Sequence, residues 1–207
     1  MKRLIGLLFT LFMIMSVNST NTFAKQLAWI VTKYGAQEQI SSGDKYYLKV
    51  DTNGLHLTYK ERSFGINLGW NKNALPNIQI EKSGGGKINC GDKVAIRVNK
   101  GGYLKYESRT WGINLVWSNT PVYQWEVRNE ANQKGTPINT DAKIAIYNSV
   151  ENDFMQYCVR RGNPVVNLGW TKDCKDGSRL PGFTNDINWK SFIEKAIKYG
   201  PLLKELL

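Results

Sequence analysis

Three copies of one pattern organise this 207-residue sequence. The copies span Lys45–Trp70, Lys93–Trp117 and Lys143–Trp170, begin 48 and 50 residues apart, and each end on Asn-Leu-x-Trp. A period of this length indicates a repeat architecture, in which each unit buries its apolar face against its neighbours. The chain is therefore expected to fold from three similar units.

Within each copy the apolar residues alternate as they do in a half-buried β-strand. Val94, Ile96 and Val98, for example, fall on one face. A turn rich in Asn, Asp and Gly follows, then a second strand, and then a third strand that ends at the Trp. A further strand lies outside each copy, at 27–31, 77–81 and 122–127. The pattern predicts twelve strands in three units of four.

The N-terminal segment differs from the repeats and predicts a signal peptide over 1–24. Lys2 and Arg3 precede an apolar run, and Thr22-Phe23-Ala24 is a small-x-Ala cleavage site. The run is shorter than the ~20 residues that a spanning helix needs. We expect a secreted or periplasmic protein after cleavage near Ala24, with no transmembrane segment in the mature chain. An uncleaved membrane anchor is the alternative.

The C-terminal segment, 174–207, has helical periodicity. Its apolar residues recur at i, i+3, i+4, i+7 and i+8: Trp189, Phe192, Ile193, Ala196 and Ile197. They predict a short, basic amphipathic helix. Such a helix packs on its own domain, binds a partner or lies on a membrane surface.

The repeat count also restricts how the strands can close. An open sheet would expose strand edges, and propellers typically use four to eight blades, so three units call for another closed form. Over 27–170 the chain resembles the β-trefoil superfamily, which includes ricin-B-type lectins and fascin-like trefoils. The resemblance implies an all-β fold, a β-trefoil of three four-stranded repeats over 25–173, to which the C-terminal amphipathic helix is added.

The resemblance to ricin-B-type lectins implies sugar-binding positions. In that family an acidic residue follows the first strand, an aromatic side chain stacks on the sugar, and an Asn follows it. The matching residues are Asp51, Trp70 and Asn77, then Asn99, Trp117 and Asn119, then Asn148, Trp170 and Lys172. Alternation with the aliphatic residues supports a second interpretation of the three Trp residues, as core residues that each bury about 150–250 Å².

Arginines at the hairpin tips form a second candidate set. Arg62, Arg109 and Arg160 lie before the third strand of their copies. Arg suits bidentate recognition of sulfate, phosphate or carboxylate groups, which would make affinity depend steeply on salt. Alternatively, these side chains lie across aromatic residues that cover the core.

Cys90, Cys158 and Cys174 are an odd number of cysteines, so at least one is unpaired or joins another chain. Export permits a disulfide. A Cys158–Cys174 bond would tie the exit loop of the third unit and contribute roughly 3 kcal/mol on the loop-entropy model. A Cys90–Cys174 bond is the alternative.

Charge and side-chain chemistry restrict the function. The net charge of +11 becomes +9 without Lys2 and Arg3, because 1–24 contain no acidic residue. The excess favours anionic partners, although it also keeps a protein dispersed. With His56 as its one histidine, the sequence contains no catalytic set, metal spacing, cofactor motif or specific nucleic-acid motif.

The sequence therefore predicts an exported, non-enzymatic module that binds glycans or anionic surface groups, such as a toxin or virulence accessory. The alternative is a protein-binding module, either a protease inhibitor or a subunit of a secreted assembly.

Overall fold

The computed structural model describes residues 26–35, 37–63, 65–110, 112–158 and 167–174. Over these residues the chain forms twelve β-strands and one 3-10 turn, η1 (Thr171–Asp173), so the predicted number of strands is confirmed. The strands are β1 (Trp29–Thr32), β2 (Lys45–Val50), β3 (His56–Tyr59), β4 (Leu68–Asn71), β5 (Ile78–Lys82), β6 (Lys93–Val98), β7 (Gly102–Tyr106), β8 (Leu115–Ser118), β9 (Trp125–Asn129), β10 (Lys143–Asn148), β11 (Asp153–Gln156) and β12 (Gly169–Trp170).

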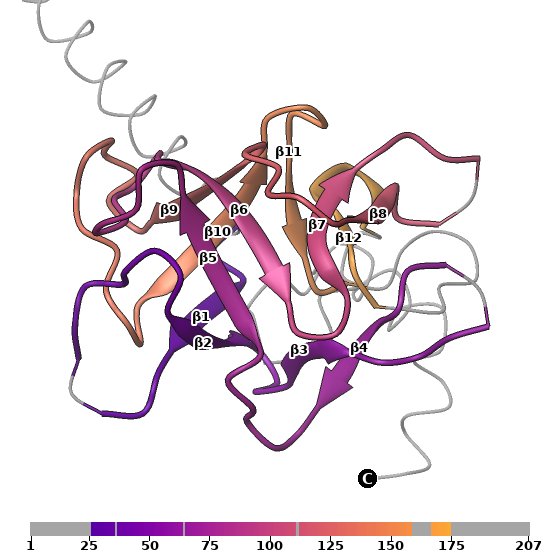
Figure 1. The fold of residues 1–207 in the computed structure, drawn as a ribbon, viewed down its shortest axis with the longest axis horizontal. Helices are drawn as coiled ribbons and strands as arrows, with labels where there is room; N and C mark the ends of the chain where they lie inside the picture. The colour runs from indigo at the N-terminus through magenta and orange to yellow at the C-terminus, as the bar shows by residue number, and fades with distance from the viewer. Residues whose placement is uncertain (1–25, 36, 64, 111, 159–166, 175–207) are drawn as a thin grey trace, which may run out of the picture.

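Six of these strands close into an antiparallel barrel (Figure 1). Around the barrel, β1 pairs with β2, β2 with β5, β5 with β6, β6 with β9, β9 with β10, and β10 returns to β1. Closure removes the free edges that an open sheet exposes. Inward-facing residues such as Val94, Ile96 and Val98 form the core, as their alternation predicts.

The remaining six strands form three outer hairpins. The hairpin strands pair as β3 with β4, β7 with β8, and β11 with β12. Each hairpin continues from a barrel strand of its own repeat, through pairings of β2 with β3, β6 with β7, and β10 with β11. Every repeat thus contributes two strands to the barrel and one hairpin outside it.

The predicted β-trefoil with a C-terminal amphipathic helix is wrong. The structure instead shows an all-β chain in which a closed six-stranded barrel carries six outer strands, with no α-helix among the described residues. Periodicity counts the strands of a repeat but does not specify which strands of different repeats pair. The signal peptide predicted over 1–24 and the helix predicted in the C-terminal segment lie outside the described residues. No helix of the described part of the chain is long and apolar enough to cross a membrane.

Three isoleucines, one from each repeat, close the end of the barrel where β2, β6 and β10 begin. Ile40, Ile88 and Ile138 are fully buried. Their backbones form a ring of hydrogen bonds: the Ile40 N–H donates to Ile138 O at 2.9 Å, the Ile88 N–H to Ile40 O at 3.0 Å, and the Ile138 N–H to Ile88 O at 3.3 Å. No repeat can complete this ring alone.

A disulfide joins the third repeat to its exit segment. Cys158 and Cys174 are bonded, with their Cα atoms 5.7 Å apart, which confirms the favoured pairing. The bond ties the segment after η1 to the end of β11. Cys90 is a buried free thiol in the loop that carries Ile88.

We predict that Ile88→Ala lowers the free energy of unfolding by about 2–5 kcal/mol, because it leaves a cavity where three repeats meet. Guanidinium denaturation of the folded protein measures the change. Leu75→Ala is the matched control, since the Leu75 side chain is exposed and its loss should cost less than about 0.5 kcal/mol. Equal losses for the two variants would contradict a central role for the isoleucine ring.

Candidate functional site

The repeated Trp residues pack against repeated Tyr residues of neighbouring units. The pairs, with the distances between ring centroids, are Tyr59–Trp117 at 6.3 Å, Tyr106–Trp170 at 5.6 Å and Tyr157–Trp70 at 4.7 Å. The third pair connects the last repeat to the first, so the aromatic contacts also run around the whole molecule. Edge-to-face and tilted pairs of this kind add stability beyond that of the area they bury.

These contacts place the Trp residues in or against the core. Trp170 is fully buried, and its indole N–H donates to Ile113 O at 2.8 Å. Trp70 and Trp117 are partly buried and pack on the core, and their indole nitrogens are buried with no hydrogen-bond partner in the described part of the chain. A Cβ at Gly101 would come within 2.5 Å of the Trp117 ring. The structure therefore supports the core interpretation, and Trp170 in particular has no surface that a sugar could reach.

The hairpin arginines hold their own hairpins together. The Arg62 Nε donates to the Leu68 carbonyl, and Arg109 Nη1 donates to the Leu115 carbonyl at 3.4 Å. Burial lowers the pKa of Arg62. Arg160 lies outside the described residues. The two described arginines thus donate hydrogen bonds to backbone carbonyls of their own hairpins. These contacts favour a structural role over an open anion-binding site.

The Asn of the Asn-Leu-x-Trp signature makes hydrogen bonds within its own hairpin. Asn67 Oδ1 accepts the Arg62 N–H at 3.1 Å, and Asn114 Oδ1 accepts the Arg109 N–H at 3.1 Å. Asn67 Nδ2 also donates to the Tyr59 hydroxyl at 3.0 Å, and Asn167 Nδ2 to the Tyr157 hydroxyl at 3.4 Å. The Asn of the signature therefore stabilises the hairpin.

Three of the four other residues implied by the lectin resemblance already contact charged or backbone groups of the fold. Asp51 Oδ2 pairs with Lys143 Nζ at 2.8 Å. Asn148 is fully buried, and its Oδ1 accepts two backbone N–H groups of the following turn. Lys172 pairs with the Glu151 carboxylate, and Asn119 is exposed beyond β8. Asn148 and Lys172 both contact Glu151, whereas Asp51 and Asn119 lie in the other two repeats.

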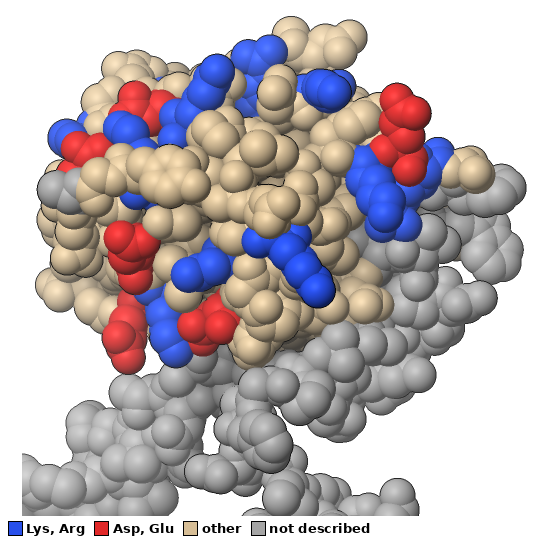
Figure 2. Space-filling model, turned by 90° about the horizontal axis from the view of Figure 1, so that it is seen from below, with Lys and Arg blue, Asp and Glu red and all other residues tan. Residues whose placement is uncertain are grey.

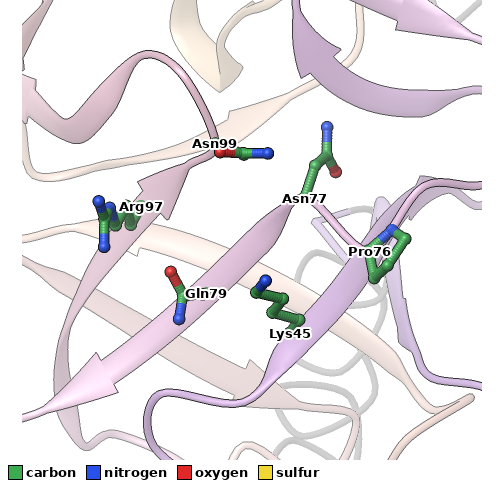
Figure 3. A pocket seen from close by; sticks show the side chains of 6 residues that line it. All are labelled: Lys45, Pro76, Asn77, Gln79, Arg97 and Asn99. Atoms are coloured by element: carbon green, nitrogen blue, oxygen red, sulfur yellow. The ribbon is translucent and has the colours of Figure 1, made fainter.

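The structure does bring together two predicted residues, Asn77 and Asn99, although the sequence analysis assigned them to different units. Both line a hollow of about 270 Å³ on the outside of the barrel (Figure 3). The lining residues are Lys45, Pro76, Asn77, Gln79, Arg97 and Asn99. We call this feature the polar hollow.

Strand register builds the polar hollow. Lys45 on β2 lies opposite Gln79 on β5, which lies opposite Arg97 on β6. Their neighbours along each strand, such as Tyr46 and Val98, are buried, so these three side chains point away from the core. The hollow is therefore a row across three strands taken from two repeats.

The amide side of the polar hollow is held by hydrogen bonds. The Asn99 N–H donates to Asn77 O at 2.8 Å, and Gln79 Nε2 donates to Gly43 O at 2.9 Å. Asn77 Nδ2 donates to Leu57 O at 3.2 Å and to Thr58 Oγ1 at 2.9 Å, and Asn77 Oδ1 is buried with no hydrogen-bond partner among the described residues. Two of the three amides, those of Asn77 and Gln79, are therefore positioned by the fold before any ligand arrives.

The polar hollow carries positive charge without an internal anion. Lys45 and Arg97 are exposed, and neither has a carboxylate within salt-bridge distance in the described ranges. Arg97 lies over the Tyr103 ring, 5.7 Å from its centroid, and the Tyr103 hydroxyl donates to Glu81. The hollow can donate hydrogen bonds to hydroxyl or acidic oxygens.

The remaining surface offers a weaker candidate. A second hollow of about 560 Å³ includes both Glu130 and Lys143, so its lining is of mixed charge. Figure 2 shows Lys and Arg spread among Asp and Glu over one face without forming a block. The described residues contain no group of three His, Cys, Asp or Glu side chains that could hold a metal ion.

Four of the six lining residues were not among those predicted from the sequence: Lys45, Pro76, Gln79 and Arg97. One signal was available, because a Lys opens each copy of the repeat at positions 45, 93 and 143. Strand alternation also places Gln79 and Arg97 on the outward face. Their meeting, however, depends on register between two repeats, which the sequence pattern does not specify.

Comparisons of this chain with protein-family models, curated proteins and solved structures found no match. The geometry of the polar hollow therefore carries the functional argument.

Glu151, which lies outside the polar hollow, should make the free energy of unfolding depend on pH. The Glu151 side chain is only 6% exposed, and it raises the pKa of Tyr106 and of Lys172 through hydrogen bonds. A raised pKa in the folded state means that the protonated form is stabilised. The stabilisation is complete below the unfolded pKa of about 10 and is lost as pH rises through the folded pKa.

We therefore expect Tyr106→Phe to destabilise the protein at pH 8 and to differ less from the wild type above pH 10. Urea denaturation of both proteins at a series of pH values measures the difference. A difference that stays constant with pH would contradict the proposed hydrogen bond between Tyr106 and Glu151.

Proposed function

We propose that this chain is an exported, non-enzymatic binding module for glycans, and that the polar hollow is its binding site. The observation that supports the proposal is that two cations, Lys45 and Arg97, and the amide side chains of Gln79 and Asn99 line one outward-facing hollow. Amides both donate and accept hydrogen bonds, as sugar hydroxyls do, and Lys and Arg donate several each. The chemistry of the lining matches the rim of a sugar ring.

Rigidity also supports the proposal. Lys45, Gln79 and Arg97 project from paired barrel strands rather than from loops. A site built on strands holds its contacts more accurately than a site on loops, and loses less entropy when a ligand binds. Sugars are weak ligands, so a preorganised site is an advantage.

Export and lack of catalysis complete the proposal. The predicted signal peptide and the Cys158–Cys174 bond both suit an oxidising compartment. The six lining residues of the hollow include no Asp, Glu, His, Cys or Ser, so they provide no acid, base and nucleophile set for hydrolysis.

A protein-binding module is the second candidate. Tyr34 is 79% exposed and Val150 is 61% exposed, and large apolar side chains of this kind occur in protein interfaces. The two candidate functions predict different ligands. A glycan should bind in the polar hollow, whereas a protein partner would contact the exposed apolar side chains.

We predict that the mature protein binds glycans on an array and that Lys45→Gln with Arg97→Gln weakens this binding by about tenfold or more, because charge-assisted hydrogen bonds are lost. Lys72→Gln with Lys134→Gln removes the same charge from exposed residues outside the hollow and should retain binding. Failure to bind any glycan, together with capture of a protein partner that requires Tyr34, would favour the second candidate.

A further inference from the structure

We infer that the polar hollow takes one acidic group of its glycan, a carboxylate or a sulfate, between Lys45 and Arg97, and that it alone of three equivalent positions is open to such a group. This inference rests on the proposed glycan-binding function. The basis is a comparison of the polar hollow with the two equivalent positions that the threefold repeat generates elsewhere on the barrel.

Backbone hydrogen bonds identify the equivalent positions. The Asn99 N–H donates to Asn77 O at 2.8 Å, the Ser149 N–H to Gln124 O at 2.9 Å, and the Asp51 N–H to Ala28 O at 3.0 Å. Asn99, Ser149 and Asp51 therefore occupy the same place in three successive units, although their side chains differ.

Strand register identifies the rest of each position. The row Lys45, Gln79 and Arg97 is repeated as Lys93, Glu126 and Tyr147, and again as Lys143, Ile30 and Lys49. Every row begins with a Lys. The second and third residues of each row differ, so the three positions share a backbone but not a chemistry.

At the position around Lys143, the Lys that opens the row is paired with a carboxylate of the same chain, while Lys49 stands in the place of Arg97. Asp51, which stands in the place of Asn99, puts its carboxylate 2.8 Å from Lys143 Nζ. Ile30 stands in the place of Gln79 and removes an amide from the row. The Asp51 carboxylate beside Lys143 shows where an anion would lie relative to Lys45 in the polar hollow.

The position around Lys93 also contains an acid. Glu126, in the place of Gln79, lies opposite Lys93 and pairs with Arg128 at 2.8 Å. The Arg128 guanidinium lies 4.1 Å from the centroid of the Tyr147 ring, and Tyr147 stands in the place of Arg97. This position has an internal anion and lacks the second cation of the row.

The polar hollow differs at both places where the other positions carry an acid. It has Gln79 where Glu126 stands and Asn99 where Asp51 stands, and each is the neutral amide of similar shape. Lys45 and Arg97 are two strands apart, about 10 Å between their backbones. Both side chains are long enough to converge on one anion once the Arg97 guanidinium turns from the Tyr103 ring on β7 toward β5. Glu81 nearby accepts hydrogen bonds from the Tyr103 hydroxyl at 2.9 and 3.0 Å.

Putting the missing acid into the hollow tests the inference. Asn99→Asp and Gln79→Glu each introduce the carboxylate that an equivalent position carries, with little change in shape. The matched control is Ser149→Asp, which adds the same charge at the equivalent exposed turn. Circular dichroism and the unfolding midpoint confirm that the variants are folded.

Isothermal titration calorimetry with three probes gives the readout: a heparin-derived oligosaccharide for sulfate, 3′-sialyllactose for carboxylate, and lactose as the neutral sugar. We expect one acidic probe to bind at one per chain, about tenfold or more tighter than lactose. Asn99→Asp and Gln79→Glu should each weaken this binding about tenfold or more, whereas Ser149→Asp should change it by less than about twofold because solvent screens distant surface charges.

The other outcomes decide against the inference in distinguishable ways. Equal affinity for lactose and the acidic probes, unchanged by Asn99→Asp, would overturn the acidic-group inference and leave glycan binding standing. Equal weakening by Asn99→Asp and Ser149→Asp would show general charge attraction and overturn the assignment to this hollow. No heat of binding with any probe, and no bound glycan on the array, would overturn the inference and the proposed function together.

Discussion

The ring of hydrogen bonds among Ile40, Ile88 and Ile138 is the constraint on which the rest of the structure depends. Buried backbone N–H and C=O groups must be paired, and here each group finds its partner only in another repeat. A single repeat would leave these groups unsatisfied, so the unit of folding is the set of three. The ring also fixes where β2, β6 and β10 begin, and with that the residues that face one another around the barrel.

The features predicted correctly are those encoded within one repeat. The twelve strands follow from alternation, and the Cys158–Cys174 bond follows from the unpaired exit of the third unit. What failed depends on contacts between repeats. The trefoil with its helix was inferred from repeat count, which does not specify pairing. Asn77 and Asn99 meet in one hollow because neighbouring repeats pair there, across a register that no single repeat contains.

The residues that are repeated in all three units and the residues proposed to bind a ligand are therefore different sets. The elements present in every repeat, such as the Trp at the end of the third strand, serve the fold: Trp170 is buried and bonded to the backbone of another unit. The residues that distinguish the polar hollow lie where the repeats differ. In a repeat protein, differences between equivalent positions are internal evidence for a binding site, because the backbone of the three positions is shared.

Effective concentration explains why a single uncompensated position matters in a chain with a net charge of +11. A carboxylate of the same chain, such as Asp51 beside Lys143, is present at an effective concentration that a dilute ligand cannot approach. Lys143 is therefore occupied before any glycan arrives. Lys45 faces Asn99 and Gln79 instead, and an amide cannot neutralise it. The net positive charge attracts acidic ligands to the whole surface. An acidic ligand binds where the cations have no carboxylate of the same chain beside them.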